Sequence, residues 1–74
     1  MRIYVNQLYP YAGENGVHLH YIEASGNSTE AQPNGDTVGG GIADGSILVE
    51  SDTGKVYFYN EASSEWVEQF SFQS

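Results

Sequence analysis

The stretch that decides the fold is the last third of the chain, residues 45–72, GSILVESDTGKVYFYNEASSEWVEQFSF. Residues 46–51 and 55–60 are rich in the β-branched and aromatic side chains that fit a pleated, half-buried surface. After a small polar connection the strand pattern resumes at Trp66. A three-stranded antiparallel meander is therefore predicted over residues 46–72.

The first turn of this meander sets the predicted register. Ser51-Asp52-Thr53-Gly54 suits a type I turn followed by a left-handed residue, because Gly54 takes positive φ without a Cβ clash. A three-residue loop of Asp52, Thr53 and Gly54 pairs Ser51 with Lys55, Val49 with Tyr57, Leu48 with Phe58 and Ile47 with Tyr59. A two-residue Thr53-Gly54 turn is the weaker alternative, because it needs positive φ at a β-branched residue.

Alternation assigns the side chains of the third strand to two faces. The first face is expected to carry Trp66, Glu68, Phe70 and Phe72, and the second Val67, Gln69 and Ser71. Aromatic residues make up 14% of the chain, and large rigid aromatic side chains often cover a sheet face or an interface. The residues predicted to form an interface are Tyr57, Tyr59, Trp66 and Phe70.

The length of the chain favours association. Its 74 residues form a single domain, 1–74, and a chain of this size buries only roughly 60–65% of its unfolded surface. No cysteine is present, so neither a disulfide framework nor a thiolate metal site can stabilise it. We therefore expect a homo-oligomer or a subunit of a larger assembly.

The N-terminal part, residues 1–24, predicts a second hairpin. Its second strand carries His18 and His20, which point to the same side and so suggest a metal site. Such a site needs further ligands, and only carboxylates could supply them, so two solvent-facing histidines are the favoured interpretation. No metal ion and no cofactor are expected.

Residues 25–45 form a loop rich in Gly, Asn and Ser, in which Gly39-Gly40-Gly41 is not expected to hold a regular element. The glycine run is not a phosphate loop, because no Gly-Lys-Ser/Thr ending and no helix follow it. A loop this long in a compact domain is usually functional or ordered by assembly. We expect partner chains to hold it.

Acidic residues dominate the charge of the chain. Ten of them stand against Arg2 and Lys55, which gives a formal net charge of −8. This charge argues against direct binding to nucleic acid or to an anionic membrane, and no apolar run approaches the roughly 20 residues of a spanning helix. The acids either keep a small protein soluble or mimic nucleic acid. Their nearly even spread along the chain gives only modest support to mimicry.

Catalysis is not expected, and no catalytic residue is assigned. The chain has no Gly-x-Ser-x-Gly nucleophile elbow, and it is too small to enclose a dry pocket. Its carboxylates show no spacing that indicates a glycosidase pair.

One part of the sequence resembles a known group. A Gly-Ser start, a short apolar strand, DTGKVYFYN at residues 52–60, a polar turn and then Glu65-Trp66-Val67 resemble the C-terminal part of small proteins of tailed bacteriophages and prophages of Gram-positive gut bacteria. The resemblance covers residues 36–68, including Asp36-Thr37. It implies a virion component of the head or tail, and it brings no catalytic residues.

The sequence as a whole predicts an all-β protein of about five short antiparallel strands in a small barrel-like or sandwich module with a C-terminal meander. The favoured function is a phage head-decoration, head-fibre or tail protein, located in the virion and assembling through aromatic sheet faces. The alternative is an acidic anti-defence inhibitor of a host nuclease or signalling protein, located in the host cytoplasm. A carbohydrate-binding module, with sugars stacked on exposed Tyr and Trp, is a third possibility.

Overall fold

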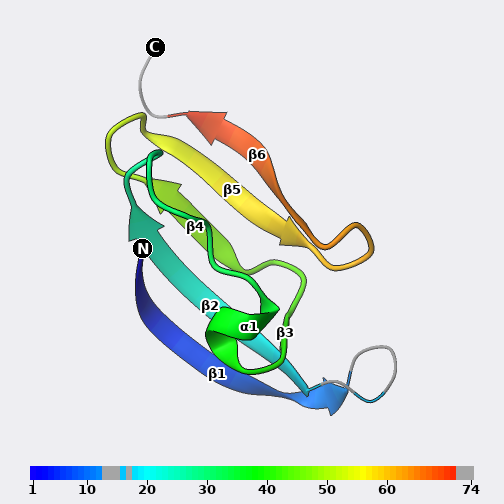
Figure 1. Ribbon diagram of the computed structural model, residues 1–74. Helices are drawn as coiled ribbons and strands as arrows, with labels where there is room; N and C mark the ends of the chain where they lie inside the picture. The colour runs from blue at the N-terminus through cyan, green and yellow to red at the C-terminus, as the bar shows by residue number, and fades with distance from the viewer. Residues whose placement is uncertain (13–15, 17, 72–74) are drawn as a thin grey trace.

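The computed structural model describes residues 1–12, 16 and 18–71, and of residues 10–12 it describes the backbone alone. Within these residues the chain forms one six-stranded sheet. Its elements in chain order are β1 (Arg2–Ala12), β2 (His18–Gly26), α1 (Gly35–Val38), β3 (Gly41–Ile42), β4 (Ile47–Glu50), β5 (Lys55–Asn60) and β6 (Glu65–Ser71) (Figure 1). The all-β prediction is confirmed, and the sheet is not a closed barrel.

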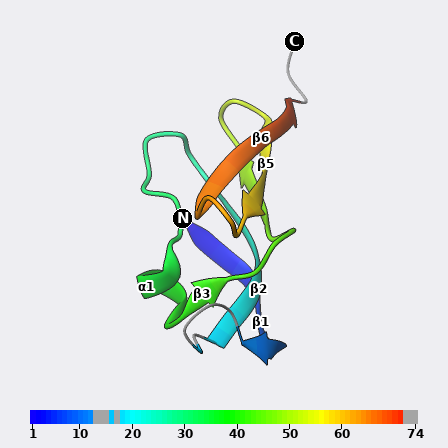
Figure 2. The same cartoon turned by 90° about the vertical axis from the view of Figure 1, so that its right-hand side faces the viewer.

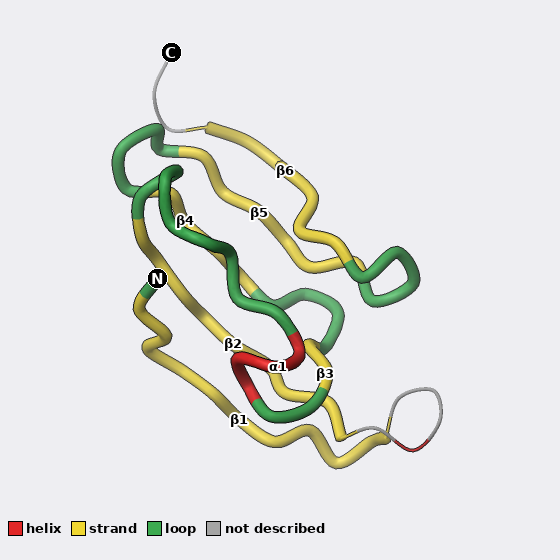
Figure 3. The backbone as a smooth tube through the Cα atoms, viewed as in Figure 1, coloured by secondary structure: helices red, strands yellow, loops and turns green. Residues whose placement is uncertain are grey.

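The strand order is β1-β2-β4-β5-β6, with β3 paired to β2. The N-terminal hairpin and the C-terminal antiparallel meander are both present as predicted. The sheet is nevertheless mixed, because β2 pairs in parallel with β3 and with β4. A parallel pair needs a connection of a dozen or more residues, and residues 27–46, here called the crossover, supply it. Figure 3 shows this crossover as a long loop interrupted by α1.

The single turn of helix in the crossover is fixed by its caps. The Asn34 Oδ1 atom accepts a hydrogen bond from Thr37 N at 3.0 Å, and Thr37 Oγ1 accepts one from Asn34 N at 3.2 Å. Together these bonds form a capping box. Four residues make a short helix, and among the described residues no helix is long and apolar enough to cross a membrane.

The triple glycine lets the crossover approach the sheet. A Cβ atom at Gly40 would collide with the carbonyl oxygen of His18, so only glycine fits this position without a shift. The prediction that the triple glycine holds no regular element is wrong for Gly41, which pairs with Leu19 in β3. Close packing of backbones explains Gly40, whereas Gly39 is the left-handed C-cap of α1, with φ of 81°.

One face of the sheet is covered by the crossover. Ile22, Val38 and Ile42 form the buried cluster, and Ile3, Tyr59 and Trp66 pack against it. Figure 2, which is turned by 90° from the first view, places α1 and the part of the crossover that leads to it on one side of the sheet. We call this side the covered face and the other side the open face.

The turn between β4 and β5 differs from the prediction. The observed pairs are Ile47 with Phe58, Leu48 with Tyr57 and Val49 with Val56. Both predicted registers are therefore wrong, because the loop has four residues, 51–54. The cause is a tertiary contact: Ser51 N donates to Gly26 O at 2.8 Å, so Ser51 belongs to the end of β2 and not to the hairpin.

The strand β6 contains a bulge that reassigns its aromatic residues. Tyr57 pairs with Glu68, but Val56 pairs with Phe70, so Gln69 has no partner on β5. The extra residue moves Phe70 to the face opposite Trp66. The prediction that Trp66 and Phe70 share a face is therefore wrong, and Phe72 lies outside the described residues.

Candidate functional site

The open face is the largest candidate for an interaction surface. Cross-strand partners point to the same side of a sheet, so the register assigns six apolar side chains of β4, β5 and β6 to it. They are Ile47, Val49, Val56, Phe58, Val67 and Phe70. Three of them remain substantially accessible, with Phe58 39%, Val67 40% and Phe70 50% exposed. The face is thus apolar across three adjacent strands.

The part of this face on β1 and β2 is more polar. Ser25 Oγ donates to the Tyr4 hydroxyl at 3.1 Å, and the Arg2 guanidinium lies 5.3 Å from the centre of the Tyr4 ring. The Tyr21 hydroxyl donates to the Glu23 carboxylate at 2.9 Å. This hydrogen bond raises the pKa of Tyr21 above its ordinary value. These polar groups border the apolar strands.

Three of the four predicted interface residues, Tyr57, Tyr59 and Trp66, lie on the covered face. Tyr59 and Trp66 pair across β5 and β6, and their rings meet edge to face with centroids 5.1 Å apart and planes at 76°. Trp66 Nε1 donates to the carbonyl oxygen of Pro33 at 2.9 Å. Both side chains therefore join the meander to the crossover.

Beside this aromatic pair lies a pocket of about 380 Å³. It opens between the part of the crossover just before α1 and the start of β6. Its lining residues are Gln32, Pro33, Asn34, Tyr59, Ser64, Glu65 and Trp66. Ser64 has φ of 55°, a left-handed backbone conformation that residues other than glycine rarely adopt.

The third predicted interface residue, Tyr57, lies among carboxylates. Burial, followed by its hydrogen bond with Glu50, raises the pKa of Tyr57 above its ordinary value, and the charges of Glu68 and Asp52 act in the same direction. Among the described ion pairs, the one cation near these carboxylates is Lys55. Its Nζ lies 3.6 Å from the Glu68 carboxylate. The end of the meander next to the 51–54 turn is therefore strongly acidic.

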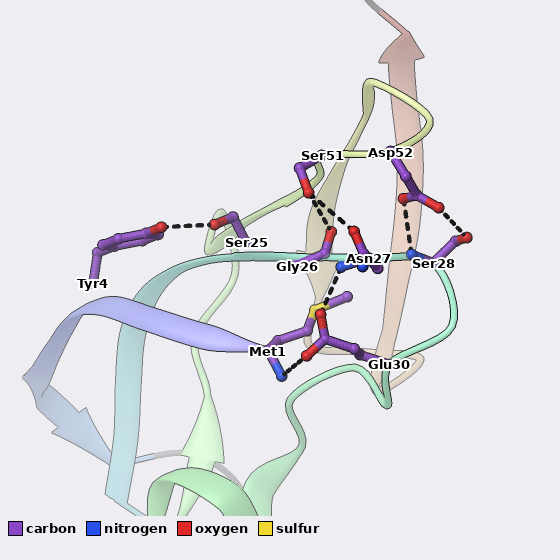
Figure 4. A network of polar contacts seen from close by, with 9 residues as sticks. All are labelled: Met1, Tyr4, Ser25, Gly26, Asn27, Ser28, Glu30, Ser51 and Asp52. Carbon is purple, nitrogen blue, oxygen red and sulfur yellow. Dashed lines mark hydrogen bonds and ion pairs between the residues drawn. The ribbon is translucent and has the colours of Figure 1, made fainter.

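Figure 4 shows that the start of the crossover is hydrogen-bonded to the 51–54 turn. The Asp52 carboxylate accepts hydrogen bonds from Ser28 Oγ at 2.6 Å and from Ser28 N at 2.9 Å. These bonds hold the pKa of Asp52 below its ordinary value. The Glu30 carboxylate accepts from Asn27 N at 2.7 Å and lies 3.0 Å from the Met1 ammonium, and the pKa of Glu30 is lowered by these two partners. The described contacts that hold this segment come from the chain itself.

The two histidines have separate surroundings. His20 Nδ1 lies 2.8 Å from Asn6 Oδ1, and His18 is exposed at the start of β2. In residues 1–12, 16 and 18–71 no group of three or more His, Asp or Glu side chains is arranged to hold a metal ion.

The sequence did not single out the crossover side of the pocket, which is formed by Gln32, Pro33 and Asn34. A local signal for part of it exists, because Asn34 and Thr37 occupy the N-cap and N3 positions of a capping box. No local signal marks Pro33, whose carbonyl meets Trp66 across more than thirty residues. Only the fold brings these groups together.

Comparison with known proteins adds no identity: no protein-family model, no curated protein and no solved structure matches this chain.

Proposed function

We propose that this chain is a non-enzymatic structural or accessory component of a phage head or tail, which associates with its own copies or with other particle proteins through the open face. The observation that carries the proposal is the accessibility of Phe58, Val67 and Phe70 on one apolar surface. Monomeric proteins rarely expose large contiguous apolar patches, and such patches mark interaction sites. The resemblance of residues 36–68 to phage proteins supplies the biological context.

The distribution of charge supports association through this face. Two copies that each carry a net charge of −8 repel one another, so they approach best where carboxylates are few. By strand alternation Glu50 and Glu68 belong to the covered face. On the open face Glu23 is engaged by Tyr21, and Glu65 lies at the first position of β6. The six apolar side chains of β4, β5 and β6 therefore offer the approach with the least repulsion.

A second candidate function rests on the acidic end of the meander. Glu50, Asp52 and Glu68 surround Tyr57, with Lys55 as the neighbouring cation. Glu50 is buried, so an anti-defence inhibitor would place the exposed Asp52 and Glu68 against basic residues of a host nuclease or signalling protein. This function needs a partner with a basic groove, whereas the first needs an apolar one.

Sedimentation velocity over a range of concentrations tests the first function. A Phe58→Thr/Val67→Thr variant keeps strand-forming residues but removes apolar area from the open face, so we expect it to sediment as a smaller species than the wild type. Leu8→Thr is the matched control, because Leu8 is 62% exposed and pairs with His20, on the covered-face side. A wild type that stays monomeric and binds no particle protein would contradict the proposal.

Mass spectrometry of gradient-purified particles from the source culture tests the phage context separately. We expect the chain to co-purify with the particles in a constant ratio to the major capsid protein. Its absence from purified particles, together with its presence in the soluble lysate, would favour the inhibitor function.

A further inference from the structure

The pocket beside Trp66 is independent of the open face. It lies on the covered side of the sheet, and its walls come from segments 32–34 and 64–66 together with Tyr59. Its volume of about 380 Å³ falls at the lower end of the range for small-molecule sites. The pocket can therefore be considered as a binding site in its own right.

The apolar wall of the pocket is a corner of two aromatic rings. Because the planes of Tyr59 and Trp66 stand at 76°, their faces bound the space from two directions. The indole N–H is already used, since it donates to Pro33 O at 2.9 Å. What Trp66 offers a ligand is thus flat apolar ring surface, which suits stacking against the C–H face of a pyranose ring.

The polar wall is formed by the side-chain amides of Asn34 and Gln32. The Asn34 Oδ1 atom is occupied by Thr37, accepting from its backbone N at 3.0 Å and from its Oγ1 at 3.1 Å. The amide NH₂ of Asn34 is therefore the group that remains for a ligand. The Gln32 amide can both donate and accept. Glu65 lines the pocket at the start of β6, but it pairs with Asn60, so strand alternation assigns its carboxylate to the open face.

This combination separates two classes of ligand that aromatic corners bind. An ammonium group binds to ring faces and to acceptors, and it would gain nothing from the donor of Asn34. A hydroxyl group both donates and accepts, so it can satisfy Gln32 and Asn34 at once. The pocket chemistry favours a neutral polyhydroxylated ligand over a cation.

The site is also held in shape before any ligand arrives. Trp66 and Tyr59 pack against the buried cluster, and the Trp66–Pro33 hydrogen bond fixes the two walls relative to one another. A site that is already formed loses little conformational freedom on binding. We infer that this pocket binds a small neutral saccharide, with a pyranose ring stacked against Tyr59 and Trp66 and its hydroxyls bound by Asn34 and Gln32.

The fluorescence of Trp66 provides a direct test, because it is the one tryptophan in the chain. We titrate the full chain with glucose, galactose, N-acetylglucosamine and their disaccharides, and in parallel with choline. At least one neutral sugar is expected to shift the emission saturably at millimolar concentration, with little dependence on salt. No response to any sugar up to about 10 mM, or a salt-sensitive response to choline alone, would overturn the inference.

Two matched variants show whether the pocket groups act as assigned. Gln32→Ala is expected to weaken the sugar response at least about tenfold, because it removes a hydrogen bond to a ligand hydroxyl. Glu65→Gln removes a charge from the open face and leaves the amides of the polar wall unchanged, so we expect no change. Equal losses for Gln32→Ala and Glu65→Gln would overturn the assignment. Circular dichroism of each variant checks that the fold is intact.

This test is separate from that of the proposed assembly. The Phe58→Thr/Val67→Thr variant changes the open face and leaves the pocket lining unchanged, so it should still bind the sugar. Failure of the sugar titration would leave the sedimentation result untouched.

Discussion

The hydroxyl of Ser46 accepts a hydrogen bond from the backbone amide of Ile22 at 3.0 Å, and both residues are fully buried. This bond fills a gap in the sheet. Residues 43–46 connect β3 to β4 and do not continue the strand beside β2. The Ile22 amide therefore has no neighbouring backbone carbonyl on this side. Ser46 supplies the missing acceptor and joins the two short parallel pairs into one sheet.

Replacing this hydroxyl should therefore destabilise the fold. Ser46→Ala leaves the Ile22 amide buried without an acceptor, and we expect a loss of about 1–3 kcal/mol in the free energy of unfolding. Ser63→Ala at an exposed turn position is the control, with a change within about 0.5 kcal/mol. Urea denaturation measures both. Equal effects of the two changes would show that Ser46 does not complete the sheet.

The turn at residues 51–54 makes a second prediction. Gly54 has φ of +72°, so Gly54→Val should cost about 1–2 kcal/mol or more. Thr53→Val should also cost about 1 kcal/mol, because Thr53 Oγ1 donates to Glu50 Oε1 at 2.7 Å and accepts from Lys55 N at 3.2 Å. A neutral Thr53→Val in thermal or urea unfolding would argue against this four-residue turn.

The two faces predict different phenotypes for two aromatic residues. Trp66→Ala removes a ring that packs against the buried cluster, so it should lower the free energy of unfolding by about 3 kcal/mol. Phe58→Thr on the open face should cost much less stability but weaken association. Urea denaturation and sedimentation on the same samples separate the effects. A Phe58→Thr variant that unfolds as easily as Trp66→Ala would show that the open face belongs to the core.

The parts of the fold that follow from local sequence were predictable. The strand pattern of residues 46–72 gave the meander, and the position of Gly54 gave a residue with positive φ. The register was not predictable, because Ser51 pairs with Gly26 through a contact that the hairpin alone does not contain. The parallel pairing of β2 was hidden for the same reason. It depends on the path of the crossover, whose composition indicates only a loop.

The candidate sites also divide into features that follow from local sequence and features that only the fold creates. Aromatic enrichment drew attention to Tyr59 and Trp66, but alternation alone placed Phe70 on the same face as Trp66. A single extra residue, Gln69, moves Phe70 to the opposite face, and no local signal in the strand indicates this bulge. The polar wall of the pocket comes from the crossover, so its groups meet Trp66 only after the chain has folded.

The attachment of the crossover predicts a dependence on pH. In the folded chain the pKa of Asp52 lies below its ordinary value of 3.8, because Ser28 donates two hydrogen bonds to the carboxylate. The contact therefore contributes fully above that ordinary value and is lost as pH falls through the lower folded pKa. Urea midpoints measured from pH 7 downwards should fall less steeply for Asp52→Asn than for the wild type. Parallel curves would show that Asp52 does not anchor the crossover.

The last prediction separates the two proposed functions by their response to salt. If copies associate through the open face, their net charges of −8 oppose the contact, and salt screens this repulsion over a Debye length of about 10 Å at 0.1 M. Self-association measured by sedimentation should then strengthen, or stay constant, as salt is raised. An inhibitor that binds a basic partner through the exposed Asp52 and Glu68 should respond in the opposite way, because salt screens its attraction. Neutralising both, as Asp52→Asn and Glu68→Gln, should abolish that binding but leave self-association intact. Binding that weakens steeply with salt, survives Phe58→Thr and is lost on this neutralisation would select the inhibitor function.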